Sequence, residues 1–317
     1  MPNLRREHYC GWPDSYILGN AAVELVVTSA IGPRIVDFHR RGGANVFYLR
    51  PSETGSTGES NWVLRGGWRL WIAPEDAATT YAPDNQPCTA EVIGPATVRV
   101  TGPPQPRAGI QKSLEVSLIA EQPRARVVSR IQNISAHDIT CAAWSLSVMR
   151  PGGRALVPFD VGNPAAFSDT RHLILWSYTK LADRRYQFGD RLMQVDQSEV
   201  LPAAAGAGRR RADESKVGVD TKQGWAAYLH GDSLYLKRFS HDPRATYPDG
   251  GATVEIYSAA EFIEVENLGP LLTLKPGEAI IAPEEWWLFE GVTVAGDEAG
   301  ALRDLEPWLQ AAAPVAS

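Results

Sequence analysis

Short apolar segments recur along the chain between clusters of glycine, proline, asparagine and aspartate. They have the length of β-strands and are rich in β-branched residues, whereas the apolar period of an amphipathic helix is nearly absent. The pattern therefore predicts an all-β chain of many short antiparallel strands, arranged as a sandwich or a barrel. The clearest strand segments are residues 23–27, 35–38, 114–119, 126–131, 144–149, 225–229, 234–239, 253–257 and 262–268.

The C-terminal stretch 297–312 departs from this pattern. Asp297 is a residue type that caps helices, because its side chain accepts a hydrogen bond from a free backbone N–H of the first turn. Pro307 is expected to limit or kink the helix. The residues that would form its apolar face are Leu302, Leu305 and Leu309. One short helix is thus predicted at the end of an otherwise β chain.

Two consecutive segments, 253–257 and 262–268, carry carboxylates at alternate positions. Side chains on a strand repeat every two residues, so each segment has an apolar face and a polar face. Glu255 lies on the polar face of the first segment, and Glu264 and Glu266 lie on that of the second. The two polar faces are predicted to form one carboxylate-bearing surface.

A four-residue hairpin loop at 258–261 would set Tyr257 opposite Phe262 and Glu255 directly opposite Glu264. Like charges opposed across a ladder are destabilising, so such a pair requires a shared proton, a cation, a nearby basic side chain or full solvation. The first three arrangements are typical of a functional site, and the fourth is typical of an exposed sheet surface. A divalent cation held between the two carboxylates would be calcium, which takes oxygen ligands.

The stretch 66–85 combines aromatic and charged residues. Flat aromatic rings cover the apolar C–H faces of sugars while arginine and carboxylates hydrogen-bond to hydroxyls, so this mixture suits a carbohydrate pocket. The alternative is that Trp68 and Trp71 pack in the core. The candidate substrate-binding residues of this stretch are Arg69, Trp71, Glu75, Tyr81 and Asp84.

Five further candidate substrate-binding residues lie elsewhere in the chain, namely Trp176, Tyr178, Lys237, Asp249 and Glu266. Trp176 and Tyr178 lie on one strand-like segment. Lys216 and Lys237 would neutralise the carboxylate-bearing surface. Asp249 lies in a glycine-rich turn, where it either points into a site or belongs to an ordinary turn.

The overall composition is that of an ordinary globular protein, with 44% hydrophobic and 21% charged residues over 317 positions. A net charge of −6 argues against a nucleic-acid or membrane partner, because such surfaces attract basic proteins. No apolar run has membrane-spanning length. Three scattered cysteines indicate reduced thiols, and together these features predict a soluble, cytoplasmic protein.

We interpret residues 1–317 as a single domain, since all-β sandwiches of this size fold as one unit. The Ala/Gly-rich stretch 203–215, which contains three consecutive arginines, is interpreted as an inserted flexible loop.

The six histidines show no spacing typical of a transition-metal site. Motifs for a serine nucleophile, a phosphate-binding loop and a dinucleotide site are also absent from the sequence.

Residues 23–27 and 32–38 resemble the first strands of galactose-mutarotase-like proteins, in which a strand is followed by a Gly-x-Arg-Ile turn. Segments spread over nearly the whole chain also resemble a family of uncharacterised bacterial proteins, domain of unknown function 4380. The resemblance implies a galactose-mutarotase-like β-supersandwich, in which two large antiparallel sheets form a concave face that holds a sugar. The segments that carry it are 66–75 with 83–85, 176–179 with 183–185, 247–255, 264–270 and 274–278.

The same resemblance implies a mechanism. In the mutarotases a glutamate of a Glu-x-Gln segment removes the proton of the anomeric hydroxyl, while a histidine protonates the ring oxygen. Glu264 resembles that base, and Glu266 stands where the glutamine is found. The strand in which the acid is expected offers Trp144 instead of histidine. A second carboxylate such as Glu255, or His241, is the candidate acid.

Three functions follow from these observations. The first is an aldose-epimerase-like enzyme that acts at the anomeric or adjacent carbon of a sugar with a glutamate as general base. The second is a saccharide-binding protein without chemistry, and the third is a glycoside hydrolase or polysaccharide lyase on the same fold. The expected partner is a small-molecule saccharide. No cofactor is expected to be required, and a divalent cation such as calcium is one of the arrangements considered above. The sequence carries no signal for a particular oligomeric state.

Overall fold

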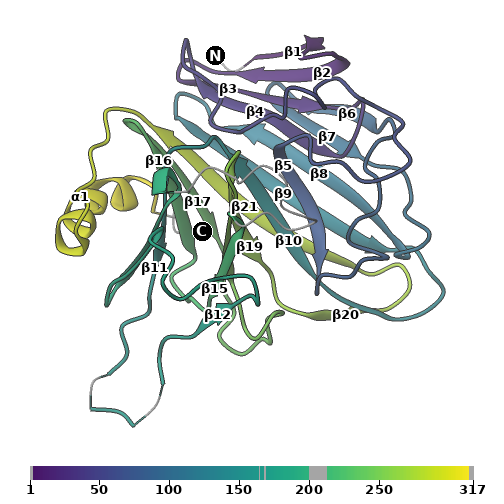
Figure 1. Ribbon diagram of the computed structural model, residues 1–317. Coiled ribbons are helices and arrows are strands. Elements are labelled where there is room, and N and C mark those ends of the chain that lie inside the picture. Colours follow the sequence, from purple (N-terminus) through teal and green to yellow (C-terminus); the bar gives the residue numbers. More distant parts are fainter. Residues whose placement is uncertain (1–2, 164, 168, 200–212, 314–317) are drawn as a thin grey trace.

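The computed structural model describes residues 3–163, 165–167, 169–199 and 213–313. Over these residues the strands gather in two large antiparallel sheets that pack against each other (Figure 1). The predicted all-β sandwich with one short C-terminal helix is confirmed. The stretch 203–215, predicted to be a loop, lies outside the described residues except for 213–215.

Both sheets combine strands from distant parts of the sequence, and their spatial order over the described part of the chain is as follows. The first sheet contains β1 (Asn3–Tyr9), β2 (Trp12–Gly19), β3 (Val23–Thr28), β4 (Arg34–Arg40), β5 (Gly67–Ala73), β10 (Ile139–Met149), β19 (Ile263–Leu268), β18 (Val254–Ser258), β15 (Ser215–Val219) and β12 (Leu173–Leu175), and β20 (Leu272–Leu274) also pairs with β10. The second sheet contains β13 (Tyr186–Phe188), β14 (Leu192–Asp196), β11 (Arg154–Pro158), β16 (Trp225–His230), β17 (Ser233–Phe239), β21 (Ala279–Phe289), β9 (Arg124–Asn133), β8 (Ile110–Leu118), β7 (Thr97–Thr101) and β6 (Thr89–Gly94).

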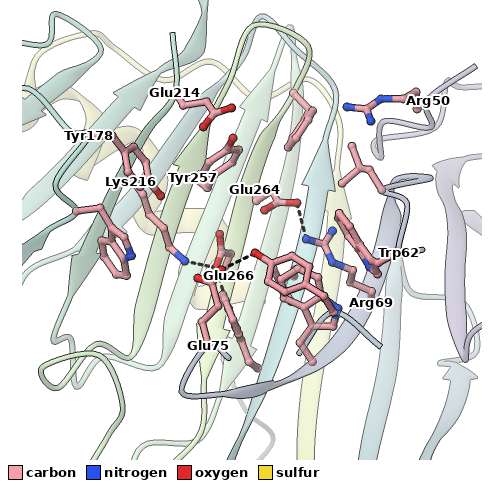
Figure 2. A pocket seen from close by; sticks show the side chains of 17 residues that line it. Arg50, Trp62, Arg69, Glu75, Tyr178, Glu214, Lys216, Tyr257, Glu264 and Glu266 are labelled. Atoms are coloured by element: carbon pink, nitrogen blue, oxygen red, sulfur yellow. Dashed lines mark hydrogen bonds and ion pairs between the residues drawn. The ribbon is translucent and has the colours of Figure 1, made fainter. Parts of the chain in front are cut away.

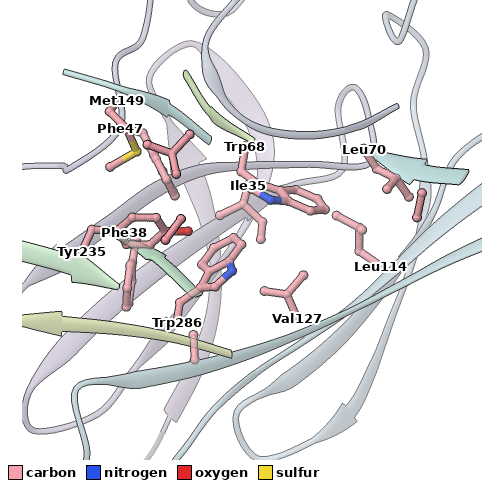
Figure 3. Packing of buried hydrophobic residues seen from close by; sticks show 14 of the residues in the cluster. Ile35, Phe38, Phe47, Trp68, Leu70, Leu114, Val127, Met149, Tyr235 and Trp286 are labelled. Atoms are coloured by element: carbon pink, nitrogen blue, oxygen red, sulfur yellow. The ribbon is translucent and has the colours of Figure 1, made fainter. Parts of the chain in front are cut away.

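The main core fills the space between the two sheets (Figure 3). Along β8 every second residue is buried, as the alternation of its sequence requires. Trp68 of the first sheet packs against Trp286 of the second, with ring centroids 5.7 Å apart, and Phe47 packs against Tyr235 at 5.8 Å. Burying one large apolar side chain contributes about 1.5–3 kcal/mol, so these contacts hold the sheets together.

The hairpin of β18 and β19 carries the predicted carboxylates, and its predicted register is wrong. Glu255 lies directly opposite Glu266 instead of Glu264, and Glu264 lies opposite Tyr257. The residue opposite Glu255 is therefore two positions further along β19 than predicted, and two positions are one full side-chain period of a strand. The predicted faces are therefore kept, with the apolar side chains of both strands in the core and the carboxylates on the other face.

The cause of the different register is the hairpin loop, which is residues 259–262. The ladder ends at the pair Ser258 and Ile263, so Phe262 belongs to the loop and not to the ladder. Within the loop the Ala259 N–H donates to the Phe262 carbonyl over 3.0 Å. Its ring packs against the rings of Tyr48 and Tyr257, with centroids 5.8 and 5.9 Å away. The aromatic contact fixes the loop one residue later than predicted.

Two helices complete the described residues, the 3₁₀ turn η1 (Gln197–Glu199) and the helix α1 (Glu298–Ala311). The Asp297 side chain caps α1 by accepting a hydrogen bond from the Gly300 N–H at 2.9 Å. The three leucines predicted for the apolar face of α1 pack against the second sheet, and Pro307 lies inside the helix. In the described part of the chain no helix is long and apolar enough to cross a membrane.

Candidate functional site

A cavity of about 340 Å³ opens on the face of the first sheet that is turned away from the core (Figure 2). Its size is at the lower end of the range for small-molecule sites, about 300–1,000 Å³. The neighbouring strands β5, β10, β19, β18 and β15 support it. These strands contribute Arg69, Trp71, Trp144, Leu146, Lys216, Tyr257, Glu264 and Glu266. The connecting segments contribute Arg50, Trp62, Leu64, Glu75, Tyr81, Trp176, Tyr178, Glu214 and Phe262.

Cross-strand pairing determines which side chains meet in the cavity. Leu146 of β10 lies opposite Arg69 of β5 on one side and opposite Glu266 of β19 on the other. Glu266 in turn lies opposite Glu255 of β18. Because directly opposed side chains share one face of the sheet, an arginine and two carboxylates that are distant in the sequence form one row.

Lys216 of β15 lies between the two opposed carboxylates. Its Nζ is 2.6 Å from Glu255 Oε2 and 3.3 Å from Glu266 Oε2. The rings of Trp144 and Trp176 flank the ammonium, with centroids 4.5 and 4.6 Å from Nζ. Lys216 therefore neutralises the carboxylate pair, as predicted, and it is the basic side chain that such a pair requires.

The protonation of these three groups is coupled. Burial raises the pKa of Glu266 to about 7, although the charge of Lys216 acts in the opposite direction. Burial also raises the pKa of Glu255 well above its ordinary value, and the charge of Glu266 adds to this effect. Burial alone would lower the pKa of Lys216, but the charges of Glu266 and Glu255 raise it. A charged ammonium thus lies beside a pair of carboxyl groups whose raised pKa values favour a bound proton near neutral pH.

The second carboxylate that faces the cavity, Glu264, is held by Arg69. Arg69 Nη2 lies 2.9 Å from Glu264 Oε1, and the two side chains are only 3% and 7% exposed (Figure 2). The guanidinium lies 4.3 Å from the ring centroid of Trp71 and 5.4 Å from that of Trp62. A planar guanidinium fixed by two rings restricts the position of Glu264.

Three aromatic rings form one wall of the cavity. The ring centroids of Trp62 and Trp71 are 5.2 Å apart, and Tyr81 lies 5.4 and 4.9 Å from them. The Tyr81 hydroxyl donates a hydrogen bond to the Glu75 carboxylate. Burial and this bond raise the pKa of Tyr81, so its phenol stays protonated at neutral pH. The wall combines apolar ring faces with a polar edge, which is the combination that a sugar requires.

Most of the predicted site residues lie in or beside this cavity. Glu255 is fully buried behind Lys216 and does not line it. Asp249 lies beside Glu255, with a left-handed backbone (φ 51°), and burial raises the pKa of its carboxyl group. The predicted residues that do line the cavity are Arg69, Trp71, Glu75, Tyr81, Trp176, Tyr178, Glu264 and Glu266.

Asp84 and His241 lie away from the cavity. The Asp84 carboxylate is bound by the guanidinium groups of Arg34 and Arg65, so its charge is used in a structural cluster. His241 stacks on Tyr247, with ring centroids 5.1 Å apart, beside a separate surface hollow. His241 is therefore not positioned as the acid partner of a carboxylate in the cavity.

Lys237 lies inside the sandwich instead of beside the carboxylate-bearing surface. It is fully buried on β17 of the second sheet, 2.9 Å from Ser145 Oγ and 3.4 Å from Glu284 Oε2. Glu284 also accepts a hydrogen bond from Trp286 Nε1 at 2.8 Å. The prediction that Lys237 neutralises the surface is wrong, because Lys237 neutralises Glu284 in the interior.

Several lining residues were not predicted. Trp144 and Leu146 alternate on one face of β10, and Tyr257 shares the face of Glu255, so strand alternation carried a signal for these three. Trp62 comes from the irregular stretch between β4 and β5, where no period relates sequence to orientation.

No metal cluster was found among the described residues, which contain no suitable group of three or more His, Cys, Asp or Glu side chains. The position predicted for calcium was the space between opposed carboxylates. Between Glu255 and Glu266 that space holds the ammonium of Lys216.

Solved structures of galactose-mutarotase-like proteins share this fold. A galactose mutarotase-like protein from Lactobacillus casei is 11% identical, with a TM-score of 0.54 over 87% of this chain and 100% of that chain. A proposed aldose 1-epimerase from Klebsiella pneumoniae is 12% identical, with a TM-score of 0.61 over 97% of this chain and 86% of that chain. A proposed mutarotase from Salmonella typhimurium is 10% identical, with a TM-score of 0.55 over 91% and 94%.

At these identities the likeness defines the fold, which is the galactose-mutarotase-like supersandwich predicted from the sequence. No protein-family model and no curated protein matches the chain. The resemblance to domain of unknown function 4380 therefore stays a prediction.

Proposed function

We propose that this protein is an aldose-epimerase-like enzyme that binds a sugar in the cavity on the first sheet and acts at its anomeric or adjacent carbon. The observation that carries the proposal is the placement of Glu264 and Glu266, two residues apart on β19, in one aromatic-lined cavity. Their surroundings differ, because Glu264 contacts Arg69 and Glu266 contacts Lys216. Two carboxyl groups in different environments suit the roles of base and acid.

In the proposed reaction Glu264 removes the proton of the anomeric hydroxyl. The electron pair of that O–H bond forms the carbonyl, and the bond between the anomeric carbon and the ring oxygen breaks. The ring oxygen takes its proton from Glu266, so the ring opens without net change in protonation. Rotation about the adjacent C–C bond and reversal of the same transfers give the other anomer.

The remaining side chains would position the sugar. Trp62, Trp71 and Tyr81 offer ring faces to its C–H surface, and Glu75 accepts hydrogen bonds from hydroxyls. Arg69 contacts Glu264 and would orient that carboxylate toward the anomeric hydroxyl. These contacts would place the reacting atoms before the proton transfers begin.

A second candidate function, saccharide binding without chemistry, is favoured by one observation. Each carboxylate proposed for catalysis already has a cation, Arg69 for Glu264 and Lys216 for Glu266. Pairing of each buried carboxylate with a cation is also what a binding protein requires, because buried unpaired charges are costly.

The test is a panel of neutral aldoses monitored by NMR or polarimetry, together with calorimetry. The enzyme accelerates anomer interconversion or epimerisation of at least one sugar, and Glu264→Gln removes the acceleration. Saccharide binding in calorimetry with no turnover supports the binding protein instead. Product analysis with oligosaccharides and uronides detects a hydrolase or a lyase, and a chelator added to the same assays shows whether activity depends on a divalent cation such as calcium.

A further inference from the structure

Glu255 belongs to a buried group of charges that the sugar cannot reach directly. We call Lys216, Glu255 and Glu266 the Lys216 cluster. Glu255 is 0% exposed and does not line the cavity, whereas Glu266 does. Glu255 faces Lys216, Glu266 and Asp249, and of these only Lys216 and Glu266 line the cavity, so any effect of Glu255 on a bound sugar passes through one of those two.

The charges of the Lys216 cluster balance only when it holds one proton. Two ionised carboxylates and one ammonium would leave a net negative charge on side chains that are almost fully buried, and such a charge is costly. One bound proton makes the cluster neutral. Two carboxyl groups that share a site commonly hold a single proton for this reason.

The surroundings of Glu266 show which groups favour each of its forms. The Trp144 Nε1–H donates to Glu266 Oε2 at 2.7 Å, and the Lys216 ammonium lies 3.3 Å from the same oxygen. Both contacts favour the ionised carboxylate. Burial and the opposed Glu255 favour the protonated form, and Glu264 on the same strand acts in the same direction.

Two further cations act on Glu266, namely Arg69 and Lys237. Arg69 Nη2 is engaged by Glu264 Oε1 at 2.9 Å, and Lys237 is paired with Glu284 in the interior of the sandwich. Lys216 is thus the cation in contact with Glu266, and Glu255 is the carboxylate that competes with Glu266 for it.

We propose that Glu255 is a positioning residue that keeps one proton on the Lys216 cluster, so that Glu266 presents a carboxylic acid to the sugar. The inference rests on the proposed function and names the source of the proton in it. When Glu266 gives its proton to the ring oxygen, Lys216 stays charged and contacts both resulting carboxylates. The proton returns to Glu266 when the ring closes, so the cluster is restored in each turnover.

The experiment is a carboxyl-carbon NMR titration of the sugar-free protein labelled at glutamate, with the Glu266 signal assigned from its loss in Glu266→Gln. In Glu255→Gln the competing carboxylate is gone, so Lys216 no longer divides its charge between two carboxylates. Lys216 and Trp144 then both stabilise the ionised form of Glu266. The titration midpoint of Glu266 is expected to fall by on the order of one pH unit or more. An unchanged or higher midpoint would overturn the proposal.

A second variant tests the opposite direction and guards against a folding defect in the first. Lys216→Met removes the ammonium and leaves both carboxyl groups, so the Glu266 midpoint is expected to rise. A fall would contradict the shared proton. Glu115→Gln, which removes a carboxylate from β8 of the second sheet, is the matched control and is expected to leave the midpoint unchanged.

The pH dependence of turnover separates this inference from the proposed function. In Glu255→Gln the alkaline limb of kcat/KM is expected to move to lower pH together with the NMR midpoint. If wild-type protein turns over a sugar and the midpoint does not move, the role of Glu255 is refuted and the enzyme function stands. If the midpoint moves and no sugar is turned over, the shared proton is supported and the enzyme function fails.

Discussion

Arg69 and Glu264 form an ion pair that spans three strands. Their side chains meet at 2.9 Å although β5 and β19 are not neighbours, since β10 lies between them. The guanidinium reaches across Leu146, the residue of β10 that faces Arg69. Arg69 therefore neutralises Glu264 and also fixes its position, and these two effects can be separated by substitution.

Arg69→Lys is expected to reduce sugar turnover by about tenfold, a loss of about 1.4 kcal/mol. The charge is kept, but a lysine lacks the planar guanidinium that stacks on Trp71, so Glu264 is held less firmly. Steady-state kinetics on the best substrate of the panel measures the effect. Arg126→Lys, an exposed change on β9, is the control, and equal rates in wild type and Arg69→Lys would show that stacking is unimportant.

Trp62→Ala is expected to weaken sugar binding by about tenfold, because it removes one ring of the aromatic wall. Trp62 lies in the irregular stretch before β5 and is only partly buried, so the fold should tolerate its loss. Calorimetric titration gives the Kd. Phe188→Ala removes an exposed ring from the second sheet and should leave the Kd unchanged. Unaltered affinity in Trp62→Ala would place the sugar elsewhere in the cavity.

Lys237→Met is expected to lower the free energy of unfolding by about 3–5 kcal/mol, since it leaves Glu284 buried without its cation. The double variant Lys237→Met/Glu284→Gln removes both charges and should lose less than the sum of the two single changes. Urea denaturation measures the three variants. The affinity for the sugar should be unaffected in Lys237→Met, and a large loss of affinity would contradict the interior role of this lysine.

The pH dependence of stability has a contribution from His39. Its Nδ1 lies 2.8 Å from Asp37 Oδ1, and this hydrogen bond raises the pKa of His39. A raised folded-state pKa stabilises the fold fully below the unfolded value of about 6.5. That contribution is lost as the pH rises through the folded-state pKa.

The unfolding free energies of wild type and His39→Gln, measured by urea denaturation between about pH 6 and pH 9, test this assignment. The stability advantage of the wild type is expected to be largest at the acidic end and to shrink with rising pH. A stability advantage of the wild type over His39→Gln that grows with pH would have the wrong sign and would reject the assignment to His39.

Much of the fold was predictable because it depends on local patterns. The alternation around Glu255 and Glu264 identified the face that the carboxylates occupy, and the Asp297 cap marked the start of the helix. The register of the hairpin was not predictable from alternation, since a shift by two positions keeps every face. It depends on the packing of Phe262 against Tyr48, a residue that is distant in the sequence.

The site was predictable where residues lie on strands with a recognisable face, and less so elsewhere. Asp84 and Lys237 are residue types suited to a sugar site, but Arg65 and Glu284 bind them in other parts of the structure. Such pairings join distant segments, so no local window of the sequence reveals them. The position of Trp62 in the cavity could not be predicted either, because an irregular segment has no period from which to infer side-chain orientation.

The measurement that tests the central claim most directly is NMR magnetisation exchange between the two anomers of each aldose in the panel, with wild type and Glu264→Gln compared at equal concentration. The account predicts that wild type raises the exchange rate of at least one sugar, and that Glu264→Gln returns it to the rate in buffer while calorimetry still detects sugar binding. Equal acceleration by both proteins, or no acceleration by wild type for any sugar, would contradict it.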